Sequence, residues 1–194
     1  MLPSQICQSQ VFGEQIGSNA CSIISVLSCF NFLSGKLNFP NNLRETLAAM
    51  ATFCDSMKLG NVLYNLSDIP ASQPNLEVRD VLHKISSLKV HIQEDLGFFT
   101  ANDIIVKFDE LLRSQRRIAG VMIIPPDKSL AILWDYGTMG LLDSHKHSPA
   151  GGIISVCTSH NAHDFVAYLA LMVARDWPGH KLEGANFTIL KLST

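Results

Sequence analysis

Several features that would point to a particular class of partner are missing from this sequence. Only 16% of its 194 residues are charged, the formal net charge is −2, and Arg116-Arg117 is a pair rather than a basic patch. Nucleic-acid binding depends on clustered lysine and arginine side chains that neutralise phosphates. The composition therefore gives no reason to expect a nucleic-acid partner. With 47% apolar residues and no repeat or low-complexity tract, the sequence is that of a globular protein.

The five cysteines follow no disulfide or zinc pattern. They are odd in number and no C-x-x-C pair occurs. Disulfide scaffolds use even numbers at framework spacings, and structural zinc modules use paired cysteines. The cysteines therefore favour a reducing compartment. A purely structural role is expected for four of them, which are Cys7, Cys29, Cys54 and Cys157.

No stretch has the pattern of a signal peptide or a membrane span. The segment Met1 to Gln8 lacks a basic region and a long apolar core. The apolar runs Ile23 to Leu33 and Phe165 to Ala174 are too short and too interrupted to cross a bilayer. We therefore expect a soluble, intracellular and cytoplasmic protein that needs no membrane. The length fits a single domain, residues 1–194, and leaves open that the chain belongs to a larger protein or is delivered into a host cell.

The period of the apolar residues changes between the two halves of the chain. Spacings of three and four predict helices first, and short apolar runs punctuated by glycine and proline predict strands later. The expected helices span residues 22–33, 41–57, 76–86, 100–111 and 161–177. The expected strands span residues 89–92, 119–124, 130–136, 141–145, 153–157 and 187–192. Short turns favour antiparallel pairing, so we predict an α+β fold with the helical part first and a mostly antiparallel sheet after it.

The stretch from Gln15 to Cys21 leads directly into the first predicted helix. Ser18 or Asn19 is expected to cap that helix, which places Cys21 in its first turn. There, unpaired backbone N–H groups and the positive end of the helix dipole favour a thiolate. Gln15 could direct its side-chain amide at an oxyanion forming beside the sulfur. Cys21 is therefore the candidate nucleophile, although a lone cysteine is more often a small buried hydrophobe.

A base for this cysteine is found in the second half, within Leu142-Asp143-Ser144-His145-Lys146-His147. Residues two apart on a strand share a face. Asp143 would therefore hold the imidazole of His145 and stabilise its charged form. Cys21, His145, Asp143 and Gln15 together would make an acyl-transfer site that needs no cofactor.

Two other interpretations of this segment stay open. Asp143 and His145 alone are as consistent with a solvated strand end as with catalysis. A metal site would combine Asp143 with imidazole ligands for zinc or a non-haem metal. The candidate ligands are His145, His147, His160 and His163. No H-E-x-x-H or comparable spacing accompanies them, so no metal is expected, and the upstream glutamine and cysteine favour catalysis.

These motifs resemble the papain-like cysteine peptidases, and within them the herpesvirus large-tegument-protein deubiquitinases and their non-viral, tegument-like relatives. Gln15 precedes Cys21 by six positions, as the oxyanion-hole glutamine does in many papain-like enzymes. The segment from Ala131 through Asp143-Ser144-His145 to Ile154 matches the tegument-like pattern of strand, glycine turn, Asp-Ser-His strand end, glycine and strand. In that family the acid precedes the histidine by two residues, whereas other papain-like proteases place an Asn or Asp after it.

The resemblance implies a substrate and a mechanism. Such enzymes cleave after the C-terminal glycine pair of ubiquitin or a ubiquitin-like modifier, so ubiquitin or polyubiquitin chains are the expected partner of a monomeric enzyme. His145 would take the proton of Cys21, the thiolate would attack the ubiquitin carbonyl, and Gln15 would hold the oxyanion. A papain-like peptidase for another ubiquitin-like or peptide substrate and an inactive ubiquitin-binding module remain alternatives.

Several details of the expected site are open. Gln10 is a second candidate oxyanion donor, and His147 stands where many relatives have arginine. The glycines at 137–140 and 151–152 are expected to wall the groove for the Gly-Gly tail, because glycine permits close backbone approach. Acidic side chains are expected to bind the arginine before that tail. The candidates are Glu14, Glu94, Asp95 and Asp135.

Overall fold

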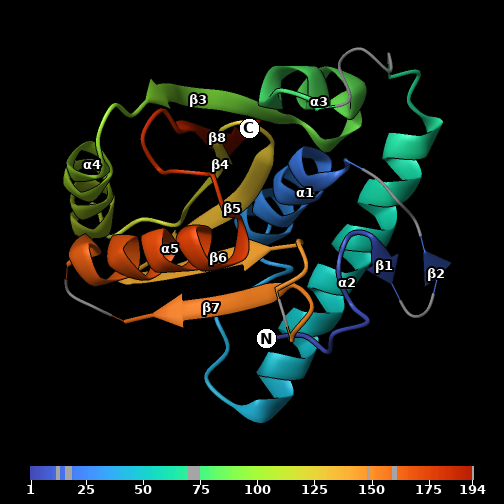
Figure 1. The fold of residues 1–194 in the computed structure, drawn as a ribbon, viewed down its shortest axis with the longest axis horizontal. Helices are drawn as coiled ribbons and strands as arrows, with labels where there is room; N and C mark the ends of the chain where they lie inside the picture. Colours follow the sequence, from blue (N-terminus) through green and yellow to red (C-terminus); the bar gives the residue numbers. More distant parts are fainter. Residues whose placement is uncertain (12–13, 16–18, 70–74, 148, 159–160, 194) are drawn as a thin grey trace.

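A six-stranded sheet lies between two groups of helices (Figure 1). The structure is a computed structural model of the chain and describes residues 1–11, 14–15, 19–69, 75–147, 149–158 and 161–193. The helices are α1 (Cys21–Leu33), α2 (Leu43–Leu66), α3 (Val78–Lys84), the 3-10 helix η1 (Ser86–Leu88), α4 (Ala101–Arg113) and α5 (Ala162–Asp176). The strands are β1 (Gln10–Val11), β2 (Glu14–Gln15), β3 (Val90–Gly97), β4 (Ile118–Ile124), β5 (Lys128–Asp135), β6 (Thr138–Asp143), β7 (Ile153–Cys157) and β8 (Asn186–Leu192).

All neighbouring strands of the large sheet are antiparallel. Their order is β3-β8-β4-β5-β6-β7, so the last strand of the chain inserts between β3 and β4. From β4 to β7 each strand pairs with the next one along the chain. The predicted α+β fold with an antiparallel sheet is confirmed. The small β1–β2 ladder was not predicted, because strands of two residues are too short to show an apolar period.

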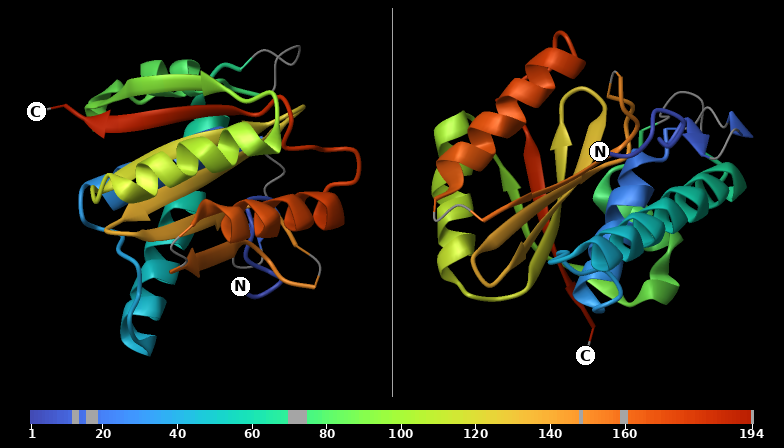
Figure 2. Two further views of the ribbon diagram at one scale, coloured as in Figure 1. Left: turned by 90° about the vertical axis from the view of Figure 1, so that its left-hand side faces the viewer. Right: turned by 90° about the horizontal axis from the view of Figure 1, so that it is seen from below.

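Both faces of the sheet are covered, which explains why its strands are continuous apolar runs. Figure 2 shows α1, α2 and α3 on one side of the sheet and α4 and α5 on the other. On β5, Ala131 and Leu133 belong to the core shared with the first group, whereas Ile132 and Trp134 belong to the core beneath α4 and α5. A sheet with one solvated face would instead alternate apolar and polar residues.

α2 differs most from its prediction. The helix was expected to end at Met57 but runs to Leu66. Leu43 and Leu47, which share the helical spacing of its apolar residues, are 76% and 57% exposed. The first turns of α2 project past the sheet (Figures 1 and 2), so their apolar residues have no partner layer even though their spacing is helical. Across the described part of the chain, no helix has both the length and the apolar character needed to cross a bilayer.

Helix α1 is fixed along its length against the sheet. It packs on β4 and β5, and the thiol of Cys29 donates to the carbonyl of Gly120 on β4 at 3.4 Å. At the C-terminal end, Arg117 Nε donates to the carbonyl of Phe32 at 2.8 Å, and the guanidinium lies over the Phe32 ring. A cation that binds the last carbonyls also complements the helix dipole. The opposite end of the helix, which carries Cys21, is thereby held in place.

The N-terminal segment, residues 2–8, lies against the connection between β6 and β7. The Leu2 N–H donates to the carbonyl of Gly152 at 2.9 Å, and the Gly151 N–H donates to the carbonyl of Leu2 at 3.1 Å. A Cβ on Gly151 would collide with the carbonyl oxygen of Ile6. Gly151 therefore makes room for the chain's own N-terminal segment, whereas a Cβ on Gly152 would first meet the carbonyl oxygen of Asp143 at 2.8 Å. The expectation that they wall a substrate groove is wrong.

Replacing Gly151 with alanine is expected to destabilise the protein by about 1–3 kcal/mol, because the added Cβ meets backbone atoms that cannot rotate away. Denaturant unfolding measures the loss. Gly97→Ala is the matched control, since a Cβ there would have only the Asn186 side-chain oxygen within reach, at 3.5 Å. Equal losses for the two variants would contradict the role given to Gly151.

Candidate active site

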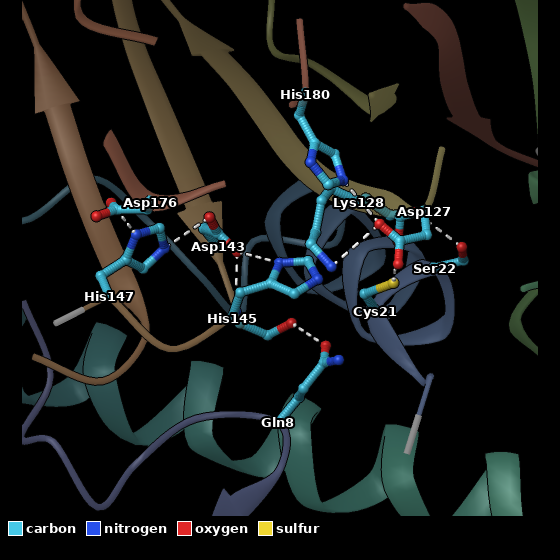
Figure 3. Close-up of polar contacts among 12 residues, drawn as sticks. Gln8, Cys21, Ser22, Asp127, Lys128, Asp143, His145, His147, Asp176 and His180 are labelled. Atoms are coloured by element: carbon cyan, nitrogen blue, oxygen red, sulfur yellow. Dashed lines mark hydrogen bonds and ion pairs between the residues drawn. The ribbon is translucent and has the colours of Figure 1, made fainter. Parts of the chain in front are cut away.

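Three side chains singled out in the sequence meet at one end of the sheet (Figure 3). Asp143 ends β6, His145 follows it, and Cys21 begins α1. His145 Nδ1 lies 2.7 Å from Asp143 Oδ1, and the His145 backbone N–H donates to the same oxygen at 2.9 Å. The imidazole of His145 lies beside Cys21, and its interaction with the thiol lowers the pKa of Cys21. The strand predicted over residues 141–145 ends at Asp143. Asp143 and His145 still lie side by side, because the Asp143 carboxylate accepts the backbone N–H of His145 and so closes the turn.

The surroundings of Cys21 favour its thiolate. Burial alone would raise the pKa of the thiol, but the hydrogen bond and positive charge of His145 and hydrogen bonds from Ser129 outweigh it and lower the pKa. In the thiol form, Sγ lies 3.7 Å from the carbonyl oxygen of Asp127 and donates to it. Cys29, in the same helix, has no such partners, and burial raises its pKa. Position in the fold, not residue type, therefore distinguishes the two cysteines.

The expected cap of α1 is not provided by Asn19. The N-cap residue is Ala20, which makes no side-chain cap hydrogen bond, and Asn19 is exposed. Ser18, the other candidate, lies outside the described residues. Alanine has no side-chain acceptor for the first N–H groups of the helix. The N-cap residue therefore leaves the first N–H groups of α1 without a side-chain acceptor.

Both oxygens of the buried Asp143 carboxylate are used. Oδ1 binds His145, and Oδ2 lies 2.8 Å from His147 Nε2. Burial would raise the pKa of Asp143, but the charges and hydrogen bonds of His145 and His147 hold it well below its usual range. Burial opposes the charge of His145, but the Asp143 carboxylate and, less strongly, Cys21 raise the pKa of His145 to about 10. The arrangement favours an ionised Asp143 beside a protonated His145.

Trp177, directly after α5, covers both imidazoles. The centroid of its ring lies 5.1 Å from that of His145 in an edge-on arrangement, and 5.7 Å from that of His147. Trp177 is itself only 6% exposed. It therefore keeps water from the His145–Asp143 pair, and hydrogen bonds are stronger in such a low-dielectric site. Sequence reasoning missed this residue, because its position at the end of a predicted helix carries no signal of the contact.

A second His–Asp pair lies near Cys21 (Figure 3). His180 Nε2 is 2.9 Å from Asp127 Oδ1, and Lys128 Nζ is 3.1 Å from the same oxygen. Burial would raise the pKa of the Asp127 carboxyl, but the hydrogen bonds and charges of these two side chains lower it. The turn between β4 and β5 therefore presents a partly neutralised carboxylate beside the nucleophile. None of these three residues was identified from the sequence, where they lie far from both motifs.

The two candidate oxyanion donors, Gln15 and Gln10, are paired across the β1–β2 ladder. The side chain of Gln15 is not among the described ones. A third glutamine, Gln8, was not considered from the sequence and is buried. Its Oε1 accepts a hydrogen bond from Ser144 Oγ at 3.0 Å, and its N–H donates to the Ser144 carbonyl at 2.7 Å. Gln8 thus supports the Asp143–His145 segment from behind.

A cavity of about 470 Å³ opens next to Ser22, the residue after Cys21. The start of α3, the strands β3 and β8 and the β4–β5 turn line it. Its carboxylates come from Glu77, Asp95 and Asp127. Asp95 pairs with Arg79 at 3.4 Å, an ion pair exposed enough to contribute little energy. A polar cleft therefore leads away from the nucleophile.

Other residues expected around a substrate groove have different roles. Glu94 forms an ion pair with Lys107, and Asp135 forms one with Arg117 at the far end of α1. Gly140 has no open face, because a Cβ there would collide with the ring of Phe39. Of the acidic candidates whose side chains are described, Asp95 alone lines the cavity. The side chain of Glu14 is not described.

The described histidines of the alternative metal site do not form a set of metal ligands. His145 and His147 each direct a ring nitrogen at Asp143. His163 is exposed on α5 and faces Asp164 at 3.5 Å. His160 lies beyond the described ranges, and within those ranges no three His, Cys, Asp or Glu side chains are arranged to hold a metal ion.

Comparison with known proteins gives a fold but no sequence family. No protein-family model matches the chain, and no curated protein does. Its structure is similar to that of the ubiquitin-specific protease encoded by murine cytomegalovirus tegument protein M48, solved in complex with a ubiquitin-based suicide substrate. The TM-score is 0.58 at 13% identity, over 99% of this chain and 85% of that one. The chain therefore has an α+β fold like that of a herpesvirus tegument deubiquitinase.

Cys21 is expected to react with iodoacetamide at lower pH than an ordinary thiol. Its lowered pKa keeps the thiolate populated as the pH falls, and His145→Gln should move the reaction midpoint upward. Peptide mass spectrometry over about pH 4 to 10 measures the alkylation of each cysteine separately. Cys29, whose pKa burial raises, is the internal control. An unchanged midpoint for Cys21 in His145→Gln would contradict the ion pair.

Proposed function

We propose that this chain is a cysteine-dependent deubiquitinase that hydrolyses the peptide or isopeptide bond after the C-terminal glycine of ubiquitin. The observation that carries the proposal is the Cys21–His145–Asp143 array on this fold. The array supplies a nucleophile, a base and an orienting acid, which acyl transfer requires. Ubiquitin as the substrate is inferred from the tegument protease, whose solved complex contains a ubiquitin-based suicide substrate.

The reaction follows from the charges of the site. The Cys21 thiolate attacks the carbonyl carbon of the terminal glycine, and the oxyanion is held by the Cys21 backbone N–H and a glutamine side chain. Protonated His145 then gives its proton to the leaving amine as the C–N bond breaks. In the second half, neutral His145 takes a proton from water and the hydroxide attacks the thioester carbonyl. The C–S bond then breaks, which releases ubiquitin with a free C-terminal carboxyl group and restores the Cys21 thiolate beside protonated His145. Asp143 stays ionised throughout.

The cavity beside Ser22 is the proposed path of the ubiquitin tail. It lies between the layer of α3 and the edge of the sheet, and it reaches the residue next to the nucleophile. Asp95 and Glu77 there can accept hydrogen bonds from an arginine side chain. Because the Arg79–Asp95 pair is exposed, an incoming arginine can displace it at little cost.

The native chain is expected to release the fluorophore from ubiquitin that carries a C-terminal fluorogenic amide. Cys21→Ser should lower kcat/KM by at least about 10³-fold, because the thiolate is lost. Cys157→Ser on β7 is the matched control and should retain activity. Turnover of another ubiquitin-like modifier or a peptide, but not of ubiquitin, would favour a different peptidase. Ubiquitin binding without turnover would favour an inactive binding module.

Gln15→Ala is expected to lower kcat by about 10²–10³-fold with little change in KM, as the loss of one oxyanion donor does. Gln10→Ala is the comparison, because the two residues are paired on one ladder and either change perturbs it similarly. Steady-state kinetics on the fluorogenic substrate separates kcat from KM. If only Gln10→Ala lowered kcat, the donor would be Gln10 instead.

A further inference from the structure

His147 is buried between two carboxylates, a position that the proposed reaction does not explain. It is 1% exposed. Its Nε2 lies 2.8 Å from Asp143 Oδ2, and its Nδ1 lies 2.6 Å from Asp176 Oδ2. An ionised carboxylate can only accept hydrogen bonds, so both ring nitrogens must carry hydrogens. The geometry therefore requires His147 to be an imidazolium.

The charges around His147 agree with this protonation state. Burial would lower its pKa, but the hydrogen bonds and charges of Asp143 and Asp176 raise it. Asp176, at the end of α5, is held in turn by Arg175, whose Nε donates to Oδ1 at 2.8 Å. A continuous series of contacts thus runs from the catalytic imidazole to the surface. Its members are His145, Asp143, His147, Asp176 and Arg175.

We propose that His147 is a positioning residue that fixes Asp143 and, as a cation, shares its negative charge with His145. If the desolvated Asp143 had His145 as its only partner, it would hold the proton of His145 more tightly. A second cation on Oδ2 weakens that hold. His145 then releases its proton more readily to the leaving amine. This inference rests on the proposed hydrolase function.

Other charged groups near this network could alter the titration of His145. They are Cys21 from α1, Asp127 and Lys128 from the β4–β5 turn, Arg175 and Asp176 from α5, and His180 across the Trp177 ring. Lys146, between the two histidines in sequence, is exposed. Cys21 is also among the groups that raise the pKa of His145. A test of His147 should therefore remove the Cys21 thiolate.

The protonation of His147 is tested in the native protein by nitrogen NMR of the histidine side chains. Both ring nitrogens of His147 should carry hydrogens at neutral pH. A neutral ring would overturn the proposal, whether or not the protein cleaves ubiquitin. Asp176→Asn removes the negative charge that favours the imidazolium and supplies an amide that can also donate to a neutral Nδ1, so the pKa of His147 should fall in that variant.

The effect on His145 is tested with His147→Gln, which keeps an N–H donor for Asp143 but removes the charge. In a Cys21→Ala background, the NMR titration of His145 should move upward by at least about half a pH unit. With Cys21 present, kcat should nevertheless fall, by about tenfold, because His145 gives up its proton less readily. If His147 were only structural, its replacement would loosen Asp143 and lower the pKa of His145, and that result would overturn the proposal.

His163→Gln is the matched control, since His163 is an exposed histidine on α5. The His163→Gln variant should change neither the titration of His145 nor kcat. His147→Arg keeps a cationic donor and should recover more activity than His147→Gln; equal losses would contradict the role of the charge. If the native protein cleaved no ubiquitin substrate, the proposed function would fail, while the two NMR titrations would still decide the protonation of His147 and its effect on His145.

Discussion

A buried negative charge at the end of β6 is the constraint on which the site depends. The Asp143 carboxylate is removed from water, and an unpaired charge there would be very costly. Each of its oxygens is bound by an imidazole, and one also accepts a backbone N–H. These partners fix the plane of the carboxylate and with it the ring of His145. Asp143 is the main cause of the raised pKa of His145, and through the charge of His145 it also contributes to the lowered pKa of Cys21.

The three layers of the fold meet at this carboxylate. The sheet supplies Asp143, α1 brings Cys21 from one side, and the end of α5 brings Asp176 and Trp177 from the other. The N-terminal segment supports the back of the site through Gln8. Because every layer contributes a group, the packing of both cores sets the distances on which acyl transfer depends.

The parts of the site that the sequence predicted are local ones. A cysteine at a helix start and an acid two residues before a histidine have recognisable spacings, and the structure brings these residues together. The contacts of Asp127, Asp176, Trp177 and His180 join residues far apart in the chain, so no spacing could reveal them. The arrangement of the helices on the two faces of the sheet was not predicted either, because apolar periodicity shows that a face is buried but not which element covers it. For the same reason Gly151 was expected to wall a substrate groove, although the atoms next to it belong to the chain's own N-terminal segment.

The most direct test of the central claim is incubation with ubiquitin that carries a thiol-reactive C-terminal electrophile, followed by intact mass and peptide mapping. The proposed site predicts one added ubiquitin, attached at Cys21, and no adduct in Cys21→Ala. Cys7, a buried cysteine of the N-terminal segment, should remain unmodified in the same sample. No adduct on the native chain, or an adduct that persists in Cys21→Ala, would contradict the claim that Cys21 is the nucleophile of a deubiquitinase.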